Sequence, residues 1–536
     1  MKFVFVTGGV MSSVGKGIVS ASIGKLLQAS GIKVYAVKMD PYVNVDAGTM
    51  NPYQHGEVFV TDDGGETDLD LGHYERFLGI NLSKEANITT GMAYKNVIER
   101  ERRGDYLGQT VQIIPHVTDE IKSLLRKNAQ LSGSDVQIVE IGGTVGDIES
   151  LPFLEAVRQL RLEEGYENTA FVHVSLVPSL DVTGELKTKP TQHSVQELRR
   201  IGIQPDYIVA RAREPVGDTI KSKLSLFSSV PTEAIFCSYD VSSIYEVPLM
   251  LEEQGMGKHI IERLRLREAS TQALRQNMLP WAAFVSRVKE AKNQATIALV
   301  GKYARFHDAY LSITEALVHA CAEVSVKPVF KWVDSESVTD ASSSQTLADS
   351  DGIMVLPGFG SRGTEGKVAA IRYARTRQVP FLGICFGMQM AVVEFARSVL
   401  GLDANSTENE PDTPNPVVDL LPEQGSVTNK GGTMRLGGYE VELAEDSLLR
   451  GLYGAPVAYE RHRHRYEVNP AYVDALTRAG LVISGRSKQG NRVEAIELPG
   501  HPFYVATQFH PEFRSRPMRP SPPYMGFVKS IAARIM

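Results

Sequence analysis

Residues 3–18 read FVFVTGGVMSSVGKGI, an apolar run that passes into a glycine-rich turn. The apolar run suits a buried parallel strand. Apolar residues then recur at helical spacing, at Val19, Ile23, Leu26 and Leu27. Gly31 stands where this helix would end, and a second extended run opens at Val34. This order of strand, turn, helix and strand predicts a βαβ unit within a parallel sheet.

Further apolar runs predict an α/β protein with two domains. The runs 136–143, 170–178, 206–212 and 233–241 fit the first sheet, and a second α/β pattern starts at 295. Between the two patterns lies an amphipathic helix with Trp281 and Phe284 on one face. We therefore expect a P-loop-like parallel-sheet domain at 1–265, a linker at 266–294 and an α/β domain at 295–536. The stretch 403–433 is rich in Pro, Asn, Gly and Ser, and is interpreted as a long loop that is either a functional lid or disordered.

The bulk composition restricts the classes of function. The chain has 536 residues and a net charge of −6, which argues against a general nucleic-acid-binding surface but leaves open a local basic pocket for a small anion. Its three cysteines include no C-x-x-C pair, a pattern typical of reduced thiols in the cytosol. It has no uninterrupted apolar stretch of about 18 residues. We expect a cytoplasmic protein that binds neither membrane nor nucleic acid.

The glycine-rich turn is a candidate phosphate site. Backbone N–H groups of such a turn, with the positive end of the following helix, form a cradle for phosphate oxygens. Lys16 could reach the β- and γ-phosphates. The match to the P-loop pattern is imperfect, because Gly9 and Gly15 are one residue too far apart and Gly17 stands where Ser or Thr would bind magnesium. The alternative is a tight turn without a ligand, but a lysine between two glycines at a helix start favours a nucleotide.

Carboxylates must hold magnesium if Gly17 cannot. The candidates are Asp70, within GGETDLDLGHYERF, and Glu140, within VQIVEIGG. Ligands bind at the carboxyl ends of parallel strands, where Glu140 would lie. Taken alone, each of these residues could instead be a surface acid or a helix cap.

The run VPFLGICFGMQMAVVEFA predicts a nucleophile in the second domain. An apolar strand leads to Gly383, Cys385 and Gly387, and an amphipathic helix follows. Small neighbours permit a strained turn that exposes the thiol at the positive end of a helix, where a thiolate is stabilised and backbone N–H groups can hold an oxyanion. The alternative is a buried core cysteine. The flanking glycines favour the nucleophile.

Three other segments offer partners for this thiol. His510 and Glu512 in TQFHPEF follow an apolar strand and would complete a Cys–His–Glu arrangement, although a polar loop is the alternative. The N–H of Gly358, in GIMVLPGFG, could complete an oxyanion hole. In ERHRHRYE at 460–467 the arginines alternate, so on a strand they would share one face, as a solvated edge or as a clamp for a carboxylate.

With both sites in view, nearly the whole chain resembles the CTP synthase family, amidoligases that convert UTP to CTP. The matching blocks are VTGGVMSSVGKG, KMDPYVNVDAGTMNPYQHGEVFVTDDGGETDLDLGHYERF, GGTVGDIES, GELKTKPTQHSV, GICFGMQ, NSTE, GGTMRLG, RHRHRYEVN and QFHPEF. GICFGMQ and HPE alone would indicate only a class I glutamine amidotransferase domain, whereas the N-terminal blocks are specific. The resemblance implies an N-terminal ATP-dependent synthase domain and a C-terminal α/β glutaminase domain.

For the synthase domain, the resemblance implies that ATP phosphorylates O4 of UTP and that ammonia displaces the phosphate. It implies ATP contacts, with Lys16 on the transferred phosphate, at Ser13, Val14, Gly15, Lys16, Gly17, Ile18, Lys38, Asp70, Tyr239, Asp240 and Val241. It implies Mg²⁺ ligands at Asp70 and Glu140. It implies contacts with UTP and with inhibitory CTP at Ser12, Asp147, Ile148, Glu149, Lys187, Thr188, Lys189, Pro190, Thr191, Gln192 and Lys223.

For the glutaminase domain, the resemblance implies that Cys385 attacks the glutamine amide with help from His510 and Glu512. It implies glutamine contacts at Gly358, Phe386, Gly387, Met388, Gln389, Glu408 and Arg465. The block around Pro52, His55 and Val58 matches the mouth of the family's ammonia passage. GTP as an activator, CTP as a feedback inhibitor and a homotetramer are also implied.

The chain departs from the family pattern in four places. Phe386 replaces a usual leucine, LPGFG replaces a proline followed by two glycines, Tyr239 replaces a common lysine, and 423–438 is short. Two other hypotheses stay open at this point. One is a glutamine-dependent amidoligase that activates a carboxylate, although the lysine-rich KTKPTQ block favours a nucleoside triphosphate. The other is a non-catalytic scaffold, which the two intact catalytic sets oppose.

Overall fold

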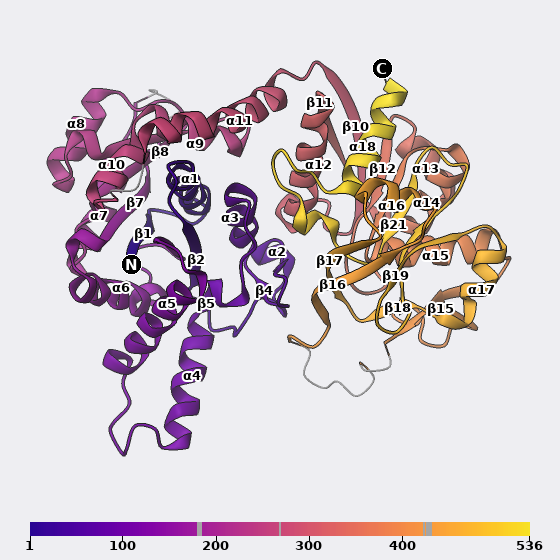
Figure 1. Cartoon of the computed structure of the whole chain (residues 1–536), viewed down its shortest axis with the longest axis horizontal. Helices are drawn as coiled ribbons and strands as arrows, with labels where there is room; N and C mark the ends of the chain where they lie inside the picture. Colours follow the sequence, from indigo (N-terminus) through magenta and orange to yellow (C-terminus); the bar gives the residue numbers. More distant parts are fainter. Residues whose placement is uncertain (180–184, 267–269, 422–423, 425–430, 536) are drawn as a thin grey trace. The chain divides into compact units, whose positions relative to one another are not determined.

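The structure is a computed structural model that describes residues 1–179, 185–266, 270–421, 424 and 431–535 (Figure 1). The chain forms two compact units. The first comprises Met1–Ala47 and Asp70–Val285, and the second comprises Gly48–Leu69 and Ser286–Met536. The second unit therefore includes a segment from the N-terminal part of the sequence, whereas the sequence-based division assigned 1–265 to one domain.

The first unit is built on a sheet in which every pair of neighbouring strands is parallel. Its order is β5-β2-β6-β1-β7-β8-β9. The strands are β1 (Lys2–Gly9), β2 (Val34–Asp40), β5 (Asn87–Thr89), β6 (Val136–Ile141), β7 (Thr169–Leu176), β8 (Tyr207–Ala212) and β9 (Ile235–Tyr239). The predicted parallel sheet is confirmed. The strand order reverses at β1, which is where α/β sheets of this kind bind ligands.

Helices cover both faces of this sheet, which explains why its strands are apolar throughout. Phe3 and Phe5 of β1 face one apolar cluster, formed with α4 (Thr90–Arg103), α5 (Thr118–Ser132), α6 (Leu151–Glu164) and α7 (Lys189–Arg200). A second group of helices packs against α1 (Lys16–Ala29). It consists of α3 (Asp70–Leu78), α9 (Val247–Glu253) and α10 (Met256–Arg263). The remaining helices include α8 (Asp218–Ser228) and α11 (Thr271–Glu290), in which the predicted apolar residues Trp281 and Phe284 are buried.

The second unit has a mixed sheet in the order β11-β10-β12-β13-β21-β20-β19-β16-β17. From β11 to β21 every pair of neighbouring strands is parallel, and from β21 to β17 every pair is antiparallel. The strands are β10 (Asn293–Gly301), β11 (Val326–Asp334), β12 (Gly352–Val355), β13 (Phe381–Ile384), β16 (Arg435–Leu443), β17 (Val457–His464), β19 (Val482–Ser487), β20 (Val493–Glu497) and β21 (Tyr504–Thr507).

Two apolar clusters lie in this second unit. One contains α14 (Thr364–Arg377) and α15 (Phe386–Ser398), and the other contains α12 (Leu311–Glu323) and α18 (Pro522–Ile535). Shorter helices are α13 (Asp340–Leu347), α16 (Leu448–Tyr453) and α17 (Pro470–Arg478). The segment Gly48–Leu69 contributes α2 (Pro52–His55) and a small hairpin of β3 (Phe59–Val60) and β4 (Glu66–Thr67). No helix in the described part of the chain is both long enough and apolar enough to cross a membrane.

The prediction of one long loop at 403–433 is wrong for much of this stretch. It contains β14 (Ala404–Ser406) and β15 (Asn415–Leu420), which form a three-stranded sheet with β18 (Tyr466–Val468). Val417 and Val418 are fully buried in the cluster around α15, and that burial holds the strand although its neighbours are turn-forming residues. Residues 422–423 and 425–430 of the expected lid lie outside the described residues.

Candidate active sites

Cys385 lies at a strained turn between β13 and α15, as the sequence predicts. Its backbone has φ 53° and ψ −102°, a conformation that non-glycine residues rarely adopt and that is characteristic of nucleophile elbows. The turn fits only because Gly387 has no side chain: a Cβ there would overlap the carbonyl of Val355. The Cys385 sulfur thus lies at the N-terminus of α15, where the first N–H groups have no partner within the helix.

Two polar groups contact this sulfur. The thiol lies 3.7 Å from the carbonyl oxygen of Arg463, and Nε2 of Gln508 donates to the sulfur at 3.6 Å. The Gln508 amide is itself near Nε2 of Gln389, at 3.3 Å. Sequence reasoning missed both Arg463 and Gln508 as neighbours of the nucleophile.

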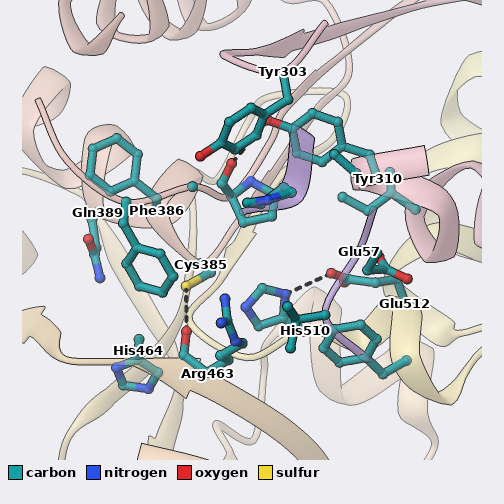
Figure 2. A pocket seen from close by; sticks show the side chains of 18 of the residues that line it. Glu57, Tyr303, Tyr310, Cys385, Phe386, Gln389, Arg463, His464, His510 and Glu512 are labelled. Carbon is teal, nitrogen blue, oxygen red and sulfur yellow. Dashed lines mark hydrogen bonds and ion pairs between the residues drawn. The ribbon is translucent and has the colours of Figure 1, made fainter. Parts of the chain in front are cut away.

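His510 and Glu512 form the predicted pair. Nδ1 of His510 lies 2.7 Å from the Glu512 carboxylate, and both residues are buried (Figure 2). No hydrogen bond joins Nε2 of His510 to a described residue. Burial lowers the pKa of His510, but the negative charges of Glu512 and of a Cys385 thiolate outweigh it and raise the pKa to about 10. The ring is therefore an imidazolium at neutral pH whenever the thiolate is present.

A cavity of about 90 Å³ in the second unit collects most of the predicted glutaminase residues (Figure 2). Those lining it are Gly358, Cys385, Phe386, Gln389, Glu408, Arg465, His510 and Glu512. Of the expected passage residues, Pro52 and Val58 line it as well. Gly387 and Met388 are instead buried in the first turn of α15. Other lining residues that the sequence did not identify are Glu57, Tyr303, Tyr310, Arg463 and Phe513.

The turn at Gly358 is held by charged groups. Lys302 donates to the carbonyl oxygens of Phe359 and Gly360, and the Gly360 N–H donates to the Glu408 carboxylate at 2.7 Å. Gly358 has φ 141°, so a side chain there would be strained. Burial lowers the pKa of Lys302 to about 8 and raises that of Glu408. The LPGFG sequence of this chain therefore forms a turn that Lys302 and Glu408 hold through hydrogen bonds, and this turn lines the same cavity as Cys385.

The departure at Phe386 also has a structural counterpart. Its ring is 4.7 Å from Nζ of Lys367 and 5.8 Å from Nζ of Lys302, so its face lies toward two lysine side chains. Burial holds the pKa of Lys367 well below its usual value. The backbone N–H at this position is one that a leucine would supply equally.

The alternating RHRHR sequence lies on β17 and directly after it. Arg461 and Arg463 pair with the chain's own carboxylates, Asp62 at 2.6 Å and Glu66 at 2.9 Å. Arg465 lines the cavity and donates to the hydroxyl of Thr433 at 3.1 Å. Arg461 and Arg463 lie on the strand two residues apart and clamp carboxylates from the segment Gly48–Leu69, whereas Arg465 lies beyond the end of the strand.

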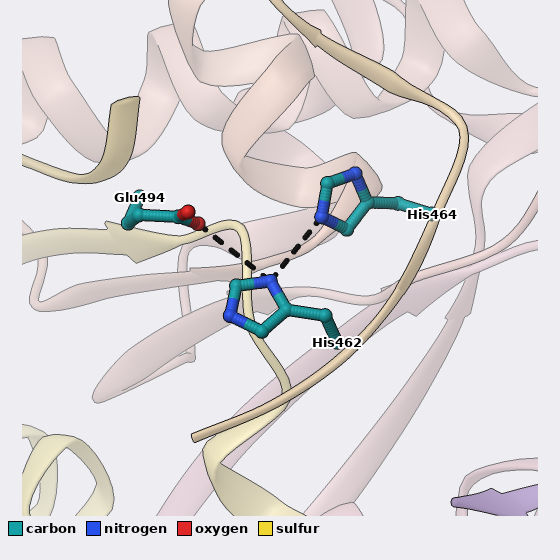
Figure 3. Close-up of side chains that lie close together, drawn as sticks. All are labelled: His462, His464 and Glu494. Atoms are coloured by element: carbon teal, nitrogen blue, oxygen red, sulfur yellow. Dashed lines mark hydrogen bonds and ion pairs between the residues drawn. The ribbon is translucent and has the colours of Figure 1, made fainter. Parts of the chain in front are cut away.

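His462 and His464 lie close to Glu494 in the core of the second unit (Figure 3). Nδ1 of His462 is 3.2 Å from Nε2 of His464 and 3.6 Å from the Glu494 carboxylate. The spacing would suit a metal, but Arg435 already pairs with Glu494 at 2.7 Å. Burial, helped by Arg435, holds the pKa of both histidines well below the usual range. We therefore interpret these two histidines as neutral side chains of β17 that are buried in the core.

In the first unit, the glycine-rich turn joins β1 to α1 as predicted. Gly15 caps α1 with φ 95°, and Ser13 also has a positive φ, of 56°. Nζ of Lys16 donates to the carbonyl of Gly143 at 2.8 Å. Burial lowers the pKa of Lys16. Ser12 and Ser13 are exposed. The turn thus presents a lysine and the start of a helix at the carboxyl edge of the sheet, which is the arrangement that phosphate sites need.

Lys38 bridges the two predicted magnesium ligands. Its ammonium pairs with Asp70 and, at 2.9 Å, with Glu140, while Tyr74 donates to the other oxygen of Glu140. Burial raises the pKa of Asp70, but Lys38 and other positive groups outweigh it and hold that pKa below its usual value. Burial and the charge of Asp70 raise the pKa of Glu140. Sequence reasoning missed Tyr74 and also Asp40, whose carboxylate lies 3.9 Å from Lys38.

This cluster fits a divalent cation. Asp40, Asp70 and Glu140 bring carboxylate oxygens together around Lys38, and oxygen atoms are the ligands that Mg²⁺ prefers. This cluster also explains why glycine, and not Ser or Thr, stands at position 17. A side chain there would overlap the Asp70 carboxylate. Asp70 thus occupies the space that the P-loop hydroxyl takes elsewhere.

The remaining predicted nucleotide contacts follow the carboxyl ends of strands of the same parallel sheet. Asp147, Ile148 and Glu149 are exposed residues that follow β6. Thr188, Lys189, Pro190, Thr191 and Gln192 lie at the start of α7, after β7. Tyr239, Asp240 and Val241 end or follow β9, and Lys223 is exposed on α8. Lys187 pairs with Glu185 at 2.6 Å. The segments after β6, β7 and β9 therefore begin at the same carboxyl edge of the parallel sheet.

Two family models match the chain. One, described as CTP synthase N-terminus, matches residues 2–266, and the other, described as glutamine amidotransferase class-I, matches residues 306–530. The two matches correspond to the two sets of candidate residues described above.

Relatives match over the full length. The CTP synthase of Methanopyrus kandleri is 60% identical over 538 residues, which cover 100% of this chain and 99% of that protein. The CTP synthase of Saccharolobus solfataricus is 58% identical over 537 residues, with 99% of each chain covered. Among solved structures, the glutaminase domain of Trypanosoma brucei CTPS with bound acivicin is 39% identical and covers 45% of this chain and 94% of that one, with a TM-score of 0.42.

Proposed function

This chain belongs to the CTP synthase family, and on that premise we propose how its two sites divide one reaction. The protein is a glutamine-hydrolysing ligase of pyrimidine nucleotide biosynthesis, in which ATP drives the amination of UTP to CTP. The observation that carries the division is the presence of two complete residue sets. Cys385, His510 and Glu512 surround a cavity in one unit, and a lysine–carboxylate cluster adjoins the glycine-rich turn in the other.

In the second unit, we assign the attack on glutamine to the Cys385 thiolate. The sulfur bonds to the amide carbon, and the resulting oxyanion is held by the N–H groups of Phe386 and Gly358. Protonated His510 gives its proton to the amide nitrogen, which leaves as neutral ammonia as the thioester forms, and Glu512 keeps the imidazole oriented and charged. Water then hydrolyses the thioester, which releases glutamate and restores the thiol. Gln389, Glu408 and Arg465 are placed to hold the amino acid portion.

In the first unit, we assign the activation of UTP to the turn that holds Lys16. Phosphorylation of O4 of UTP creates a leaving group, which neutral ammonia displaces to give CTP and phosphate. Lys16 stabilises the charge on the phosphoryl group in transfer. Asp70 and Glu140 would hold Mg²⁺, which when bound neutralises charge on the ATP phosphates. Lys38, which now bridges these carboxylates, would turn toward a phosphate oxygen.

The other assignments rest on the family resemblance together with the position of the residues at the sheet edge. Lys187, Lys189 and Lys223 supply positive charge for the triphosphate of UTP or of inhibitory CTP in an otherwise acidic protein. Tyr239, Asp240 and Val241 would meet the adenosine of ATP. We also propose activation by GTP, a homotetramer, passage of ammonia past Pro52, His55 and Val58, and a cytoplasmic location, which the three free cysteines support.

The deciding experiment is incubation of the purified protein with ATP, Mg²⁺, glutamine and UTP, followed by chromatography. We expect CTP, glutamate, ADP and phosphate in equal amounts. Hydrolysis of glutamine without any CTP would rule out the assignment. It would instead revive the hypothesis of an amidoligase that acts on a carboxylate, which the full-length relatives do not favour.

A further inference from the structure

The hairpin of residues 59–67 is held to the glutaminase core by charge. Arg461 is completely buried, and its guanidinium donates to the Asp62 carboxylate at 2.6 Å and to the carbonyl of Val60 at 3.0 Å. Arg514 donates to the same carboxylate oxygen at 2.7 Å. Burial raises the pKa of Asp62, but the two guanidinium groups outweigh it and hold the pKa below its usual value. Because a buried cation without its partner is costly, this hairpin is an integral part of the second unit.

Arg463 connects the hairpin to the turn beside the nucleophile. Its Nε donates to the Glu66 carboxylate at 2.9 Å, and the Glu66 side chain is only 1% exposed. Its guanidinium carbon lies 5.3 Å from the centre of the Phe359 ring, next to Gly358. Its carbonyl oxygen faces the Cys385 sulfur at 3.7 Å. One residue thus contacts the hairpin, the oxyanion turn and the nucleophile.

A second line of contacts reaches the catalytic histidine. The ring of Phe59 meets the ring of Phe513 edge to face, with centroids 5.1 Å apart. Phe513 in turn stacks on the imidazole of His510, with centroids 5.2 Å apart and planes at 18°. The orientation of the imidazole therefore depends on an aromatic side chain that the hairpin supports.

We infer that the hairpin of residues 59–67 is a positioning element of the glutamine-hydrolysing centre, and that the Glu66–Arg463 ion pair transmits its position to the oxyanion turn. This inference rests on the proposed function. Glu66 is not among the residues that line the cavity, whereas Arg463 is. Glu66 is therefore a positioning residue that acts through Arg463. The hairpin ends at Thr67, three residues before Asp70, so the chain leads directly from this element to a proposed magnesium ligand.

The test is the variant Glu66→Gln, which keeps the shape and removes the charge that fixes Arg463. We expect kcat for glutamine hydrolysis to fall about tenfold or more, because small displacements of an oxyanion turn are felt mainly in the transition state. KM for glutamine, alkylation of Cys385 by iodoacetamide and CTP synthesis from free ammonia should stay near wild type. Glu440→Gln is the matched control, because Glu440 and its partner Lys488 form an exposed ion pair, and it should change none of these rates.

A double variant separates positioning from general damage. If Glu66 acts through Arg463, then the losses in Glu66→Gln and Arg463→Gln should not multiply in the variant that carries both changes. Arg463→Lys keeps the charge but loses the planar fork, so it should recover only part of the kcat that Arg463→Gln loses. If Glu66→Gln fails to fold, the comparison of these two Arg463 variants tests the inference instead.

Several outcomes would overturn the inference. Wild-type kcat in Glu66→Gln would do so, as would losses that multiply in the double variant. An equal loss of alkylation and of ammonia-driven synthesis would show general damage and would overturn it too. A failure of the proposed function looks different, because the wild-type protein itself would then make no CTP from UTP, whatever residue stands at position 66.

Discussion

At the scale of the residue, the proposed function gives Cys385 a role in only one of the two half-reactions. The variant Cys385→Ala should lose glutamine-driven CTP synthesis by about 10⁴-fold or more, since nothing else in the cavity can form the thioester. CTP synthesis from added ammonia should persist, because the lysine–carboxylate cluster is untouched. The two rates are measured on one preparation by the absorbance change from UTP to CTP. Loss of both activities would contradict the division of labour between the units.

The pH dependence of glutamine hydrolysis should report the Glu512–His510 pair. The pKa of His510 is raised to about 10, so the imidazolium that protonates the departing amide nitrogen is present below that pH and is lost as pH rises through it. Removing the Glu512 charge in Glu512→Gln takes away part of the upward shift. The alkaline limb of kcat/KM should therefore move down by about 1 pH unit or more. The profile is measured from about pH 6 to about pH 11, so that it includes the alkaline limb of the wild-type enzyme. An alkaline limb that stays in place, or moves up, would contradict the assignment of the proton to His510.

At the scale of the element, the junction of β1 and α1 makes a prediction that opposes the usual P-loop pattern. Gly17→Ser would restore the hydroxyl that P-loops use for magnesium, but the new side chain would collide with the Asp70 carboxylate. We expect ammonia-driven CTP synthesis to fall about a hundredfold, with glutamine hydrolysis in the absence of nucleotide unchanged. The control is Gly217→Ala, at a helix cap where a Cβ meets nothing within 4 Å. A Gly17→Ser enzyme with normal or improved Mg²⁺ activation would contradict the structural role given to Asp70.

The elements that could be predicted from the sequence are those whose signals are local. The strand–turn–helix units around Lys16 and Cys385 combine short apolar runs, glycines and helical periodicity within about twenty residues, and the structure confirms both. The strands at 404–420 were missed because Pro, Asn and Gly dominate that stretch and only Val417 and Val418 mark the buried face. Burial by α15, which is a tertiary effect, decides their conformation.

The parts of the sites that the sequence could not indicate come from distant segments. Glu57 reaches the cavity from a stretch more than two hundred residues before Cys385, and its carboxylate accepts from the N–H and hydroxyl of Ser312. Tyr74 contacts Glu140 although it carries no phosphate-binding signature. Arg463 was noted only as one of several alternating arginines, and its contact with Glu66 pairs two segments that no local pattern connects.

At the scale of the whole molecule, the second unit is discontinuous in sequence. The segment Gly48–Leu69 belongs to it, although the chain returns at Asp70 to the first unit. The carboxylates of Glu57, Asp62 and Glu66 bind partners at Ser312, Arg461 and Arg463. A polypeptide of 286–536 alone would therefore leave the guanidinium of Arg461, which is buried in the intact chain, without its carboxylate.

This discontinuity predicts that the fragment 286–536 is incomplete and that a peptide of residues 48–69 repairs it. Breaking the Arg461–Asp62 pair should destabilise the fragment by about 3 kcal/mol, the lower end for buried pairs, since the Asp62 side chain stays 25% exposed. Urea unfolding of the fragment should shift to higher midpoints as the peptide is added, and glutamine hydrolysis should rise with it. A peptide carrying Asp62→Asn and Glu66→Gln should bind more weakly and restore less of both. Equal stability and equal hydrolysis with and without the natural peptide would contradict this prediction. They would show that the fragment folds and acts without residues 48–69.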